Sequence, residues 1–231
     1  LNSRRTMTFW EMQNQRDRKY LQRILASRGV GGLQQEILES LTRQSERPAV
    51  DVQVNRGGRA VSAAARPDHI AQFAFMNLPT APVSLNEGWA EIAGNEARDA
   101  RIKVGNQSGR AVKYVEIGWI LKDREGREFL AGSVPSAESD LYLPPGQHGE
   151  LLQDTTLRFS RGPNQPVDIQ SMTGFVSQVE FSDGTAWVPT RDALGASHLG
   201  KLVPPSPEEQ RLTDLYRKKG MQALLQDLNR Y

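Results

Sequence analysis

The sequence contains no cysteine. This absence excludes disulfide bonds, thiolate metal sites and cysteine nucleophiles within the chain. The sequence also has no run of the roughly 18–20 apolar residues that a membrane-spanning helix needs. The chain begins at Leu1 and not at a methionine, which is compatible with a start codon, a signal peptide or a membrane anchor upstream of it.

Motifs of known catalytic chemistry are also scarce. The three histidines, His69, His148 and His198, lie in unlike contexts and lack the spacing of metal ligands. No serine lies in a G-x-S-x-G elbow, and no Gly-rich phosphate loop is present. The sequence therefore predicts no catalytic residue, no metal and no cofactor.

Two sets of acidic residues remain as candidates for chemistry. Near a predicted turn lie Asp123, Glu125 and Glu128. Carboxylates can bind a hard cation, but the arginines at 124 and 127 alternate with these three and favour a salt-bridged, solvated turn. A hydrolase built on Asp154 and Asp168 needs a concave pocket with perturbed carboxyl groups, and their spacing gives no sign of one.

Charge and composition limit the class of partner. The formal net charge is only +2, and a pI near 9.0 reflects a small excess of Arg and Lys. The basic N-terminal segment lacks the dense charge and repeated aromatics of a nucleic-acid arm, so no nucleic-acid partner is expected. Aromatic residues make up 7% of the chain and the mean hydropathy is −0.56. We expect a core concentrated in part of the chain, with polar extensions around it.

The middle of the chain has the pattern of an antiparallel sheet. In the clearest strand, Val115, Ile117, Trp119 and Leu121 recur at period two. A strand before it would place Leu85, Glu87, Trp89, Glu91 and Ala93 on one face. About seven short strands separated by turns are typical of a sandwich. The predicted fold is mainly β, an immunoglobulin-like antiparallel β-sandwich with N-terminal and C-terminal α-helical extensions.

The chain ends have helical patterns. The glycine run at 29–32 is expected to stop an N-terminal helix. In the C-terminal helix, Ser206 suits the N-cap, Pro207 the first helical position, and Glu209 can complete a capping box. Gly220 is placed to end that helix. No internal repeat is apparent.

These patterns predict four parts. They are a helical N-terminal arm (1–45), a connector with one or two strands (46–84), a β-sandwich domain (85–195) and a C-terminal helical tail (196–231).

Several turns and strands match a known family. The segment 104–108, VGNQS, resembles the V-x-N-x-S step of FxLYD-type domains, which are bacterial immunoglobulin-like modules. The segment 119–126, WILKDREG, stands where the family has F-x-L-Y-D-x-x-G, with Trp119 for Phe and Lys122 for Tyr. The segment 143–146, LPPG, resembles the later L-x-P-G turn. The resemblance covers about residues 100–185 and implies a non-catalytic domain outside the cytoplasmic membrane.

The function predicted from these features is a non-enzymatic structural or interaction module. We expect an accessory or scaffold subunit of a larger, membrane-associated bacterial assembly that is periplasmic or membrane-attached, with a cytoplasmic location as the alternative. The helical ends would contact a protein partner, because their thin apolar stripes cannot form a core alone. The predicted contact residues are Phe9, Trp10, Tyr20, Leu21, Leu212, Leu215, Tyr216 and Leu224.

Two alternatives remain open. The N-terminus could lie close to a membrane, with Phe9 and Trp10 at the interface. The sandwich could instead be an extracytoplasmic sensory or ligand-binding domain. Binding of a glycan would need Trp89, Trp119 and Trp187 to be exposed in a row, although all three are more simply core or half-core residues.

Overall fold

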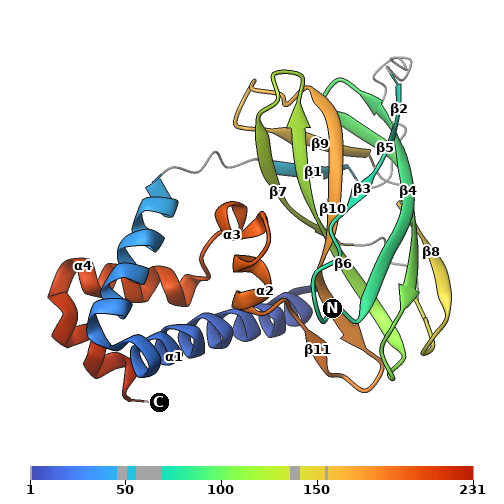
Figure 1. Ribbon diagram of the computed structural model, residues 1–231. Helices are drawn as coiled ribbons and strands as arrows, with labels where there is room; N and C mark the ends of the chain where they lie inside the picture. Colours follow the sequence, from blue (N-terminus) through green and yellow to red (C-terminus); the bar gives the residue numbers. More distant parts are fainter. Residues whose placement is uncertain (1, 46–50, 56–68, 136–140, 154–155, 231) are drawn as a thin grey trace. The chain divides into compact units, whose positions relative to one another are not determined.

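The computed structural model describes residues 2–45, 51–55, 69–135, 141–153 and 156–230, and these form two compact units (Figure 1). The helical unit combines Leu1–Arg47 with Thr190–Tyr231, and the β unit is Pro48–Pro189. This division differs from the predicted one. The N-terminal arm and the C-terminal tail belong to one unit, and the predicted connector belongs mostly to the β unit.

The β unit contains eleven named strands among its described residues. They are β1 (Asp51–Asn55), β2 (His69–Gln72), β3 (Ala74–Phe75), β4 (Val83–Ala93), β5 (Glu96–Asn106), β6 (Val112–Asp123), β7 (Glu128–Pro135), β8 (His148–Gln153), β9 (Thr156–Ser160), β10 (Ile169–Phe181) and β11 (Ala186–Trp187). One sheet has the order β1-β9-β5-β4-β2, with β8 also paired to β5; the other has the order β11-β10-β6-β7, with β3 paired to β10. Only the β3–β10 pair is parallel among these described strands.

The two sheets share one hydrophobic core. It includes Val104 from the first sheet and Trp119, Leu121 and Val179 from the second. The period-two face predicted for residues 115–121 is therefore confirmed. The antiparallel sheets and the helices at both chain ends are also confirmed. Strands and helices hold similar shares of the chain, however, so the fold is a mixed one and not mainly β.

The predicted face of β4 is wrong in part. A register shift between Leu85 and Glu87 places an extra residue in the strand. Leu85 is 2% exposed, whereas Glu87 is exposed and pairs with Lys103 at 2.7 Å. A bulge of this kind interrupts the alternation of faces, so a strict period of two could not locate the buried side chains.

The family-like motifs lie at the ends of β5 and β6 and in turns of the β unit. Buried Asn106 donates through Nδ2 to the carbonyl oxygens of Arg110 and Leu143, at 2.7 and 2.8 Å. Buried Asp123 accepts through Oδ1 from the backbone N–H of Arg127 at 2.8 Å and through Oδ2 from its Nε at 2.8 Å. These side chains are occupied in holding backbone, which is a structural role.

The helical unit consists of α1 (Asn2–Ser45), α2 (Arg191–Gly195), α3 (Leu199–Leu202) and α4 (Pro207–Leu228). Both long helices are broken at one glycine. Gly29 has φ 68° and ψ −169°, and Gly220 has φ 80° and ψ −177°. This region of backbone space is open essentially only to glycine. The predicted breaks are confirmed, and each long helix is a pair of shorter ones.

The two broken helices share a sequence pattern. The buried residues Leu21, Leu33 and Ile37 of α1 lie 191 positions before Leu212, Leu224 and Leu228 of α4, and Gly29 lies the same distance before Gly220. Those six apolar residues are the buried members of one hydrophobic cluster. The expectation of no internal repeat was therefore wrong. The repeat is short, and its two copies are separated by the whole β unit.

The N-terminus of α4 is capped as predicted, with one exception. Ser206 Oγ accepts from the backbone N–H of Glu209 at 3.2 Å. The reciprocal half of the capping box is missing, because the N–H of Ser206 donates to Asp17 Oδ2 at 3.2 Å. The carboxylate of Glu209 is thereby left to bind other groups.

Candidate functional site

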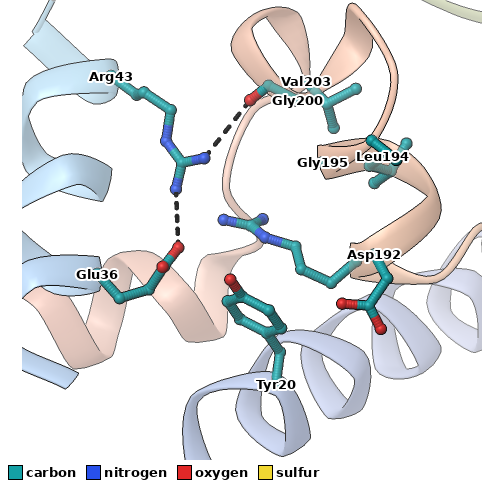
Figure 2. A pocket seen from close by; sticks show the side chains of 10 residues that line it. Tyr20, Glu36, Arg43, Asp192, Leu194, Gly195, Gly200 and Val203 are labelled. Carbon is teal, nitrogen blue, oxygen red and sulfur yellow. Dashed lines mark hydrogen bonds and ion pairs between the residues drawn. The ribbon is translucent and has the colours of Figure 1, made fainter. Parts of the chain in front are cut away.

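A cavity of about 260 Å³ lies within the helical unit. It is lined by Tyr20, Glu36, Arg43, Arg191, Asp192, Leu194, Gly195, Ala196, Gly200 and Val203. Figure 2 shows Tyr20 on one part of α1, Glu36 and Arg43 on the other, and Leu194 and Val203 on the short segment that holds α2 and α3. The cavity exists because the break at Gly29 lets two parts of α1 face the same space.

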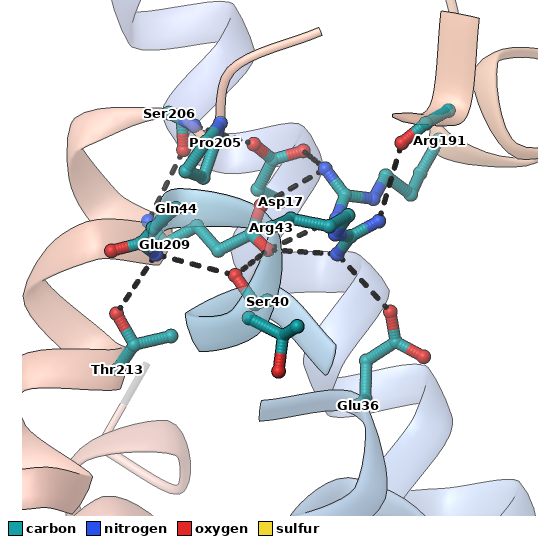
Figure 3. Close-up of polar contacts among 12 residues, drawn as sticks. Asp17, Glu36, Ser40, Arg43, Gln44, Arg191, Pro205, Ser206, Glu209 and Thr213 are labelled. Atoms are coloured by element: carbon teal, nitrogen blue, oxygen red, sulfur yellow. Dashed lines mark hydrogen bonds and ion pairs between the residues drawn. The ribbon is translucent and has the colours of Figure 1, made fainter. Parts of the chain in front are cut away.

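The cavity adjoins a network of buried charges (Figure 3), to which its lining residues Glu36, Arg43 and Arg191 belong. Glu209 and Asp17 are each 1% exposed. Arg191 pairs with Glu209 at 2.9 Å and approaches Asp17 at 3.8 Å, while Arg16 Nε donates to Asp17 at 2.7 Å. Burial of so many charges is tolerated only because each acid has an arginine beside it.

A third arginine, Arg43, completes the network on the cavity side. Arg43 Nη2 lies 3.7 Å from Glu36 and 3.6 Å from Glu209. Glu209 also accepts a hydrogen bond of 2.6 Å from Ser40. The contacts of Arg43 Nη2 with these two carboxylates are longer than hydrogen bonds, whereas the contacts of Arg191 and Ser40 with Glu209 are not.

The pKa values of the network follow from this geometry. Burial raises the pKa of Asp17, but the hydrogen bond from Arg16 and the charges of Arg16 and Arg191 outweigh it, so its pKa is below the ordinary value. Burial acts to lower the pKa of Arg191, and Glu209 and Asp17 outweigh that effect and raise it. Burial and the Glu36 carboxylate raise the pKa of Tyr20. At neutral pH Asp17 and Arg191 are charged and Tyr20 is a neutral phenol.

The repeated pattern explains why these charges collect on one side. In the first copy of the repeat, which lies in α1, Arg18 pairs with Glu208 and Asp227 of the second copy, which lies in α4, at 2.7 and 3.0 Å. The equivalent position of the second copy is Glu209, and the residues equivalent to the two partners are Asp17 and Glu36. The acids Asp17, Glu36 and Glu209 therefore meet on one side of the repeat. The equivalent residues on the other side are two acids and one arginine, Arg18. Arg191 and Arg43 supply the missing positive charge.

The predicted contact residues divide into buried and exposed ones. Leu21, Leu212 and Leu224 are buried in the cluster of the helical unit, Tyr20 and Tyr216 pack against it, and Leu215 is half-buried. Phe9 is 2% exposed, whereas Trp10 is 50% exposed. The thin stripes thus form a small core together, and contact with a partner stays a prediction.

The other predicted candidates lie apart from the cavity. His69, His148 and His198 are exposed on β2, on β8 and at the start of α3. In the described part of the chain no three His, Asp or Glu residues are grouped as a metal site. Asp168 pairs with Arg124 at 3.1 Å, and Asp154 lies outside the described residues. Arg127 pairs with Asp123 and Glu125 at 2.8 Å each, as expected for a salt-bridged turn.

The tryptophans do not form an exposed row. Trp119 is 1% exposed, and Trp187 packs against the core of the β unit. Trp89 is half-buried, with the guanidinium carbon of Arg101 5.6 Å from its ring centroid. This arrangement supports the core and half-core interpretation of these residues.

Among the residues that line the cavity, the sequence interpretation named Tyr20, as a partner contact, and missed the charged ones. Glu36, Arg43 and Arg191 come from segments far apart in the chain, and nothing local marks them as partners. One signal was available. Asp17 is an acid within the apolar stripe that contains Leu21 and Ile24, and a charge in such a stripe needs a buried partner.

None of the helices among the described residues combines the length and the apolar character that crossing a membrane requires.

Comparisons with known proteins give no family. No family model matches the chain, and no curated protein sequence is significantly similar to it. A hypothetical protein from Peptoclostridium difficile is 14% identical in a structural match that covers 57% of this chain and 98% of that one, with a TM-score of 0.33. A Bordetella pertussis protein provisionally assigned as ApaA is 13% identical, with 62% and 95% covered and a TM-score of 0.28. Similarity at this level indicates neither family nor function.

Proposed function

We propose that this chain is a non-catalytic interaction module, an accessory or scaffold subunit of a larger bacterial assembly at a membrane. In this proposal the β unit is an immunoglobulin-like sandwich of the FxLYD type. Its shared core between two sheets supports that assignment, as do Asn106 and Asp123, which hold turns at the family-like positions. The same resemblance supports an extracytoplasmic location.

One observation supports the interaction role most directly. The chain ends form a helical unit with its own core, and α1 of that unit carries Trp10 with half of its surface exposed. Aromatic side chains are enriched at protein interfaces because they bury a large area at little cost in conformational entropy. A helix that is already folded can present such a side chain without an ordering penalty.

Site-specific photocrosslinking tests this role. A photoreactive phenylalanine analogue replaces Trp10 in one variant and Ser182, an exposed residue of the β10–β11 turn, in the control. We expect a discrete adduct of one higher mass in native cells from position 10 and none from position 182. A chain that is monomeric by light scattering and gives no adduct from position 10 in native cells would contradict the proposal.

The cavity favours a second candidate function, the binding of a small ligand. It differs from the sensory alternative predicted from sequence, because the cavity lies in the helical unit and not on a sheet face or at its loops.

A further inference from the structure

The cavity contains a buried polar group with incomplete bonding. Arg43 Nη2 is buried and has no hydrogen-bond partner among the described residues. Its nearest carboxylates, those of Glu36 and Glu209, are 3.7 and 3.6 Å away. The other terminal nitrogen, Nη1, donates only a long bond of 3.4 Å to the carbonyl oxygen of Gly200. A buried donor left in this state is costly, so a group that accepts from it would be stabilised.

The second copy of the repeat holds an equivalent group of charged residues in which the hydrogen bonds are complete. There Arg211 donates to Glu208 at 2.8 Å through both Nε and Nη2, and to Asp227 at 3.0 and 2.7 Å. The residue equivalent to Arg211 in the first copy is Tyr20, and the acid equivalent to Asp227 is Glu36. Without that arginine, the ion pairing of Glu36 among the described residues is limited to its long contact with Arg43, and the Tyr20 hydroxyl is the other group beside its carboxylate. The copy that lacks this arginine is therefore the one whose Tyr20 and Glu36 line the cavity.

We propose that this cavity binds a small zwitterion, an aliphatic α-amino acid. Its carboxylate accepts from Arg43, and its ammonium group donates to Glu36. Leu194 and Val203, which lie across the cavity from Glu36 in Figure 2, contact the aliphatic side chain. A volume of about 260 Å³ suits a molecule of this size and is below the roughly 300–1,000 Å³ of drug-sized sites.

Charge balance selects a zwitterion over a simple ion. The three acids of the network, Asp17, Glu36 and Glu209, are matched by the three arginines, Arg16, Arg43 and Arg191. An anion alone would add a negative charge beside three carboxylates, and an amine alone would add a positive charge beside three guanidinium groups. A molecule with both charges keeps the buried network neutral and can hydrogen-bond to both Arg43 and Glu36, whose own 3.7 Å contact is too long for a hydrogen bond.

Calorimetric titration of the full chain tests the proposal. The probes are L-valine and its two matched fragments, isobutylamine, which lacks the carboxylate, and 3-methylbutanoate, which lacks the amine. We expect saturable binding of L-valine, and binding of each fragment at least about tenfold weaker. Equal binding of L-valine and one fragment would show a site for a simple ion and would overturn the proposal. No binding of L-valine at tens of millimolar would also overturn it.

Variants connect the binding to the cavity. Arg43→Met and Glu36→Gln are each expected to weaken L-valine binding about tenfold or more, since each removes one charged contact. Arg28→Met makes the same change at an exposed position of α1 and is expected to leave the affinity unchanged. Circular dichroism shows whether each variant is folded. If Arg43→Met does not fold, Arg43→Lys, which keeps the charge, replaces it in the titration. A folded Arg43→Met or Glu36→Gln variant that binds as tightly as the wild type would place the ligand elsewhere.

Discussion

At the scale of single residues, Asn106 holds two segments of the β unit together. Its Nδ2 joins the carbonyl oxygens of Arg110 and Leu143, and its Oδ1 accepts from the backbone N–H and the hydroxyl of Ser108 at 2.9 and 2.7 Å. An asparagine can donate to one segment and accept from another in this way because its side-chain amide carries both an NH₂ donor and an oxygen acceptor.

Replacing Asn106 is expected to destabilise the β unit. Asn106→Ala removes the four hydrogen bonds of a buried side-chain amide and should lower the free energy of unfolding by about 2–3 kcal/mol. Gln107→Ala, at the exposed neighbouring position, should change it by less than about 0.5 kcal/mol. Urea denaturation followed by tryptophan fluorescence measures both. Equal effects of the two substitutions would show that the asparagine network contributes nothing.

Asp227 makes the helical unit sensitive to acid. The hydrogen bonds from Arg211 are the main cause that lowers its pKa from 3.8 to about 2; burial opposes them and Arg18 adds to them. Because the pKa is lower in the folded state, the stabilisation is fully present above about pH 4 and is lost as the pH falls through 2. Asp227→Asn should therefore cost about 1–2 kcal/mol at pH 7 and much less once the pH is below the folded-state pKa of about 2.

Denaturation at a series of pH values checks this expectation. Asp214→Asn provides the matched control, since Asp214 pairs with Arg217 at the exposed surface of the same helix. Surface pairs contribute little, so that variant should stay within about 0.5 kcal/mol of the wild type at every pH. A cost of Asp227→Asn that is independent of pH would rule out an ionic role for Asp227.

At the scale of elements, glycines decide the shape of the long helices. Gly29 lies in a backbone region closed to other residues, whereas Gly31, two positions later, has no such φ and belongs to the helix. A methyl group added at either position meets no atom within 4 Å. The two sites thus differ in backbone conformation and not in available space.

Alanine substitutions at these two glycines should have opposite signs. Gly29→Ala is expected to destabilise the helical unit by about 1–3 kcal/mol, because it forces a strained conformation. Gly31→Ala should stabilise it by up to about 1 kcal/mol, since alanine favours the helix. Chemical denaturation monitored by circular dichroism gives both values. Stabilisation by Gly29→Ala would mean that α1 is one continuous helix.

At the scale of the whole molecule, the chain has two cores instead of one. The cluster of the β unit and the cluster of the helical unit share no residue. Units with separate cores need not unfold in one transition. Circular dichroism at 222 nm reports mainly on the helices, and tryptophan fluorescence reports mainly on the β unit, which holds Trp89, Trp119 and Trp187.

We expect the two signals to give different unfolding midpoints. Asn106→Ala should move only the fluorescence transition. Glu209→Gln, which disturbs the buried network of the helical unit, should move only the helical one. Should either substitution shift both transitions by the same amount, the two units would be one cooperative structure.

The amino-acid sequence by itself determined the local features. Ser206 and Pro207 begin α4, Gly29 and Gly220 break the long helices, and alternation from 115 to 121 identifies the face of β6 that lies in the core of the β unit. Each of these depends on contacts or backbone angles within a few residues, so the signal lies in one stretch of sequence.

Only the tertiary structure decided which distant residues meet. It joined the two chain ends into one unit, paired Arg18 with Asp227, and brought Glu36, Arg43 and Arg191 around one cavity. A buried charge marks the need for a partner but does not identify it, because ion pairs form between any segments that folding places within about 4 Å. The hydrogen bond from the N–H of Ser206 to Asp17 escaped the sequence for the same reason, since the competing partner lies 189 positions away. The bulge in β4 escaped it because its place is set by the pairing with β5.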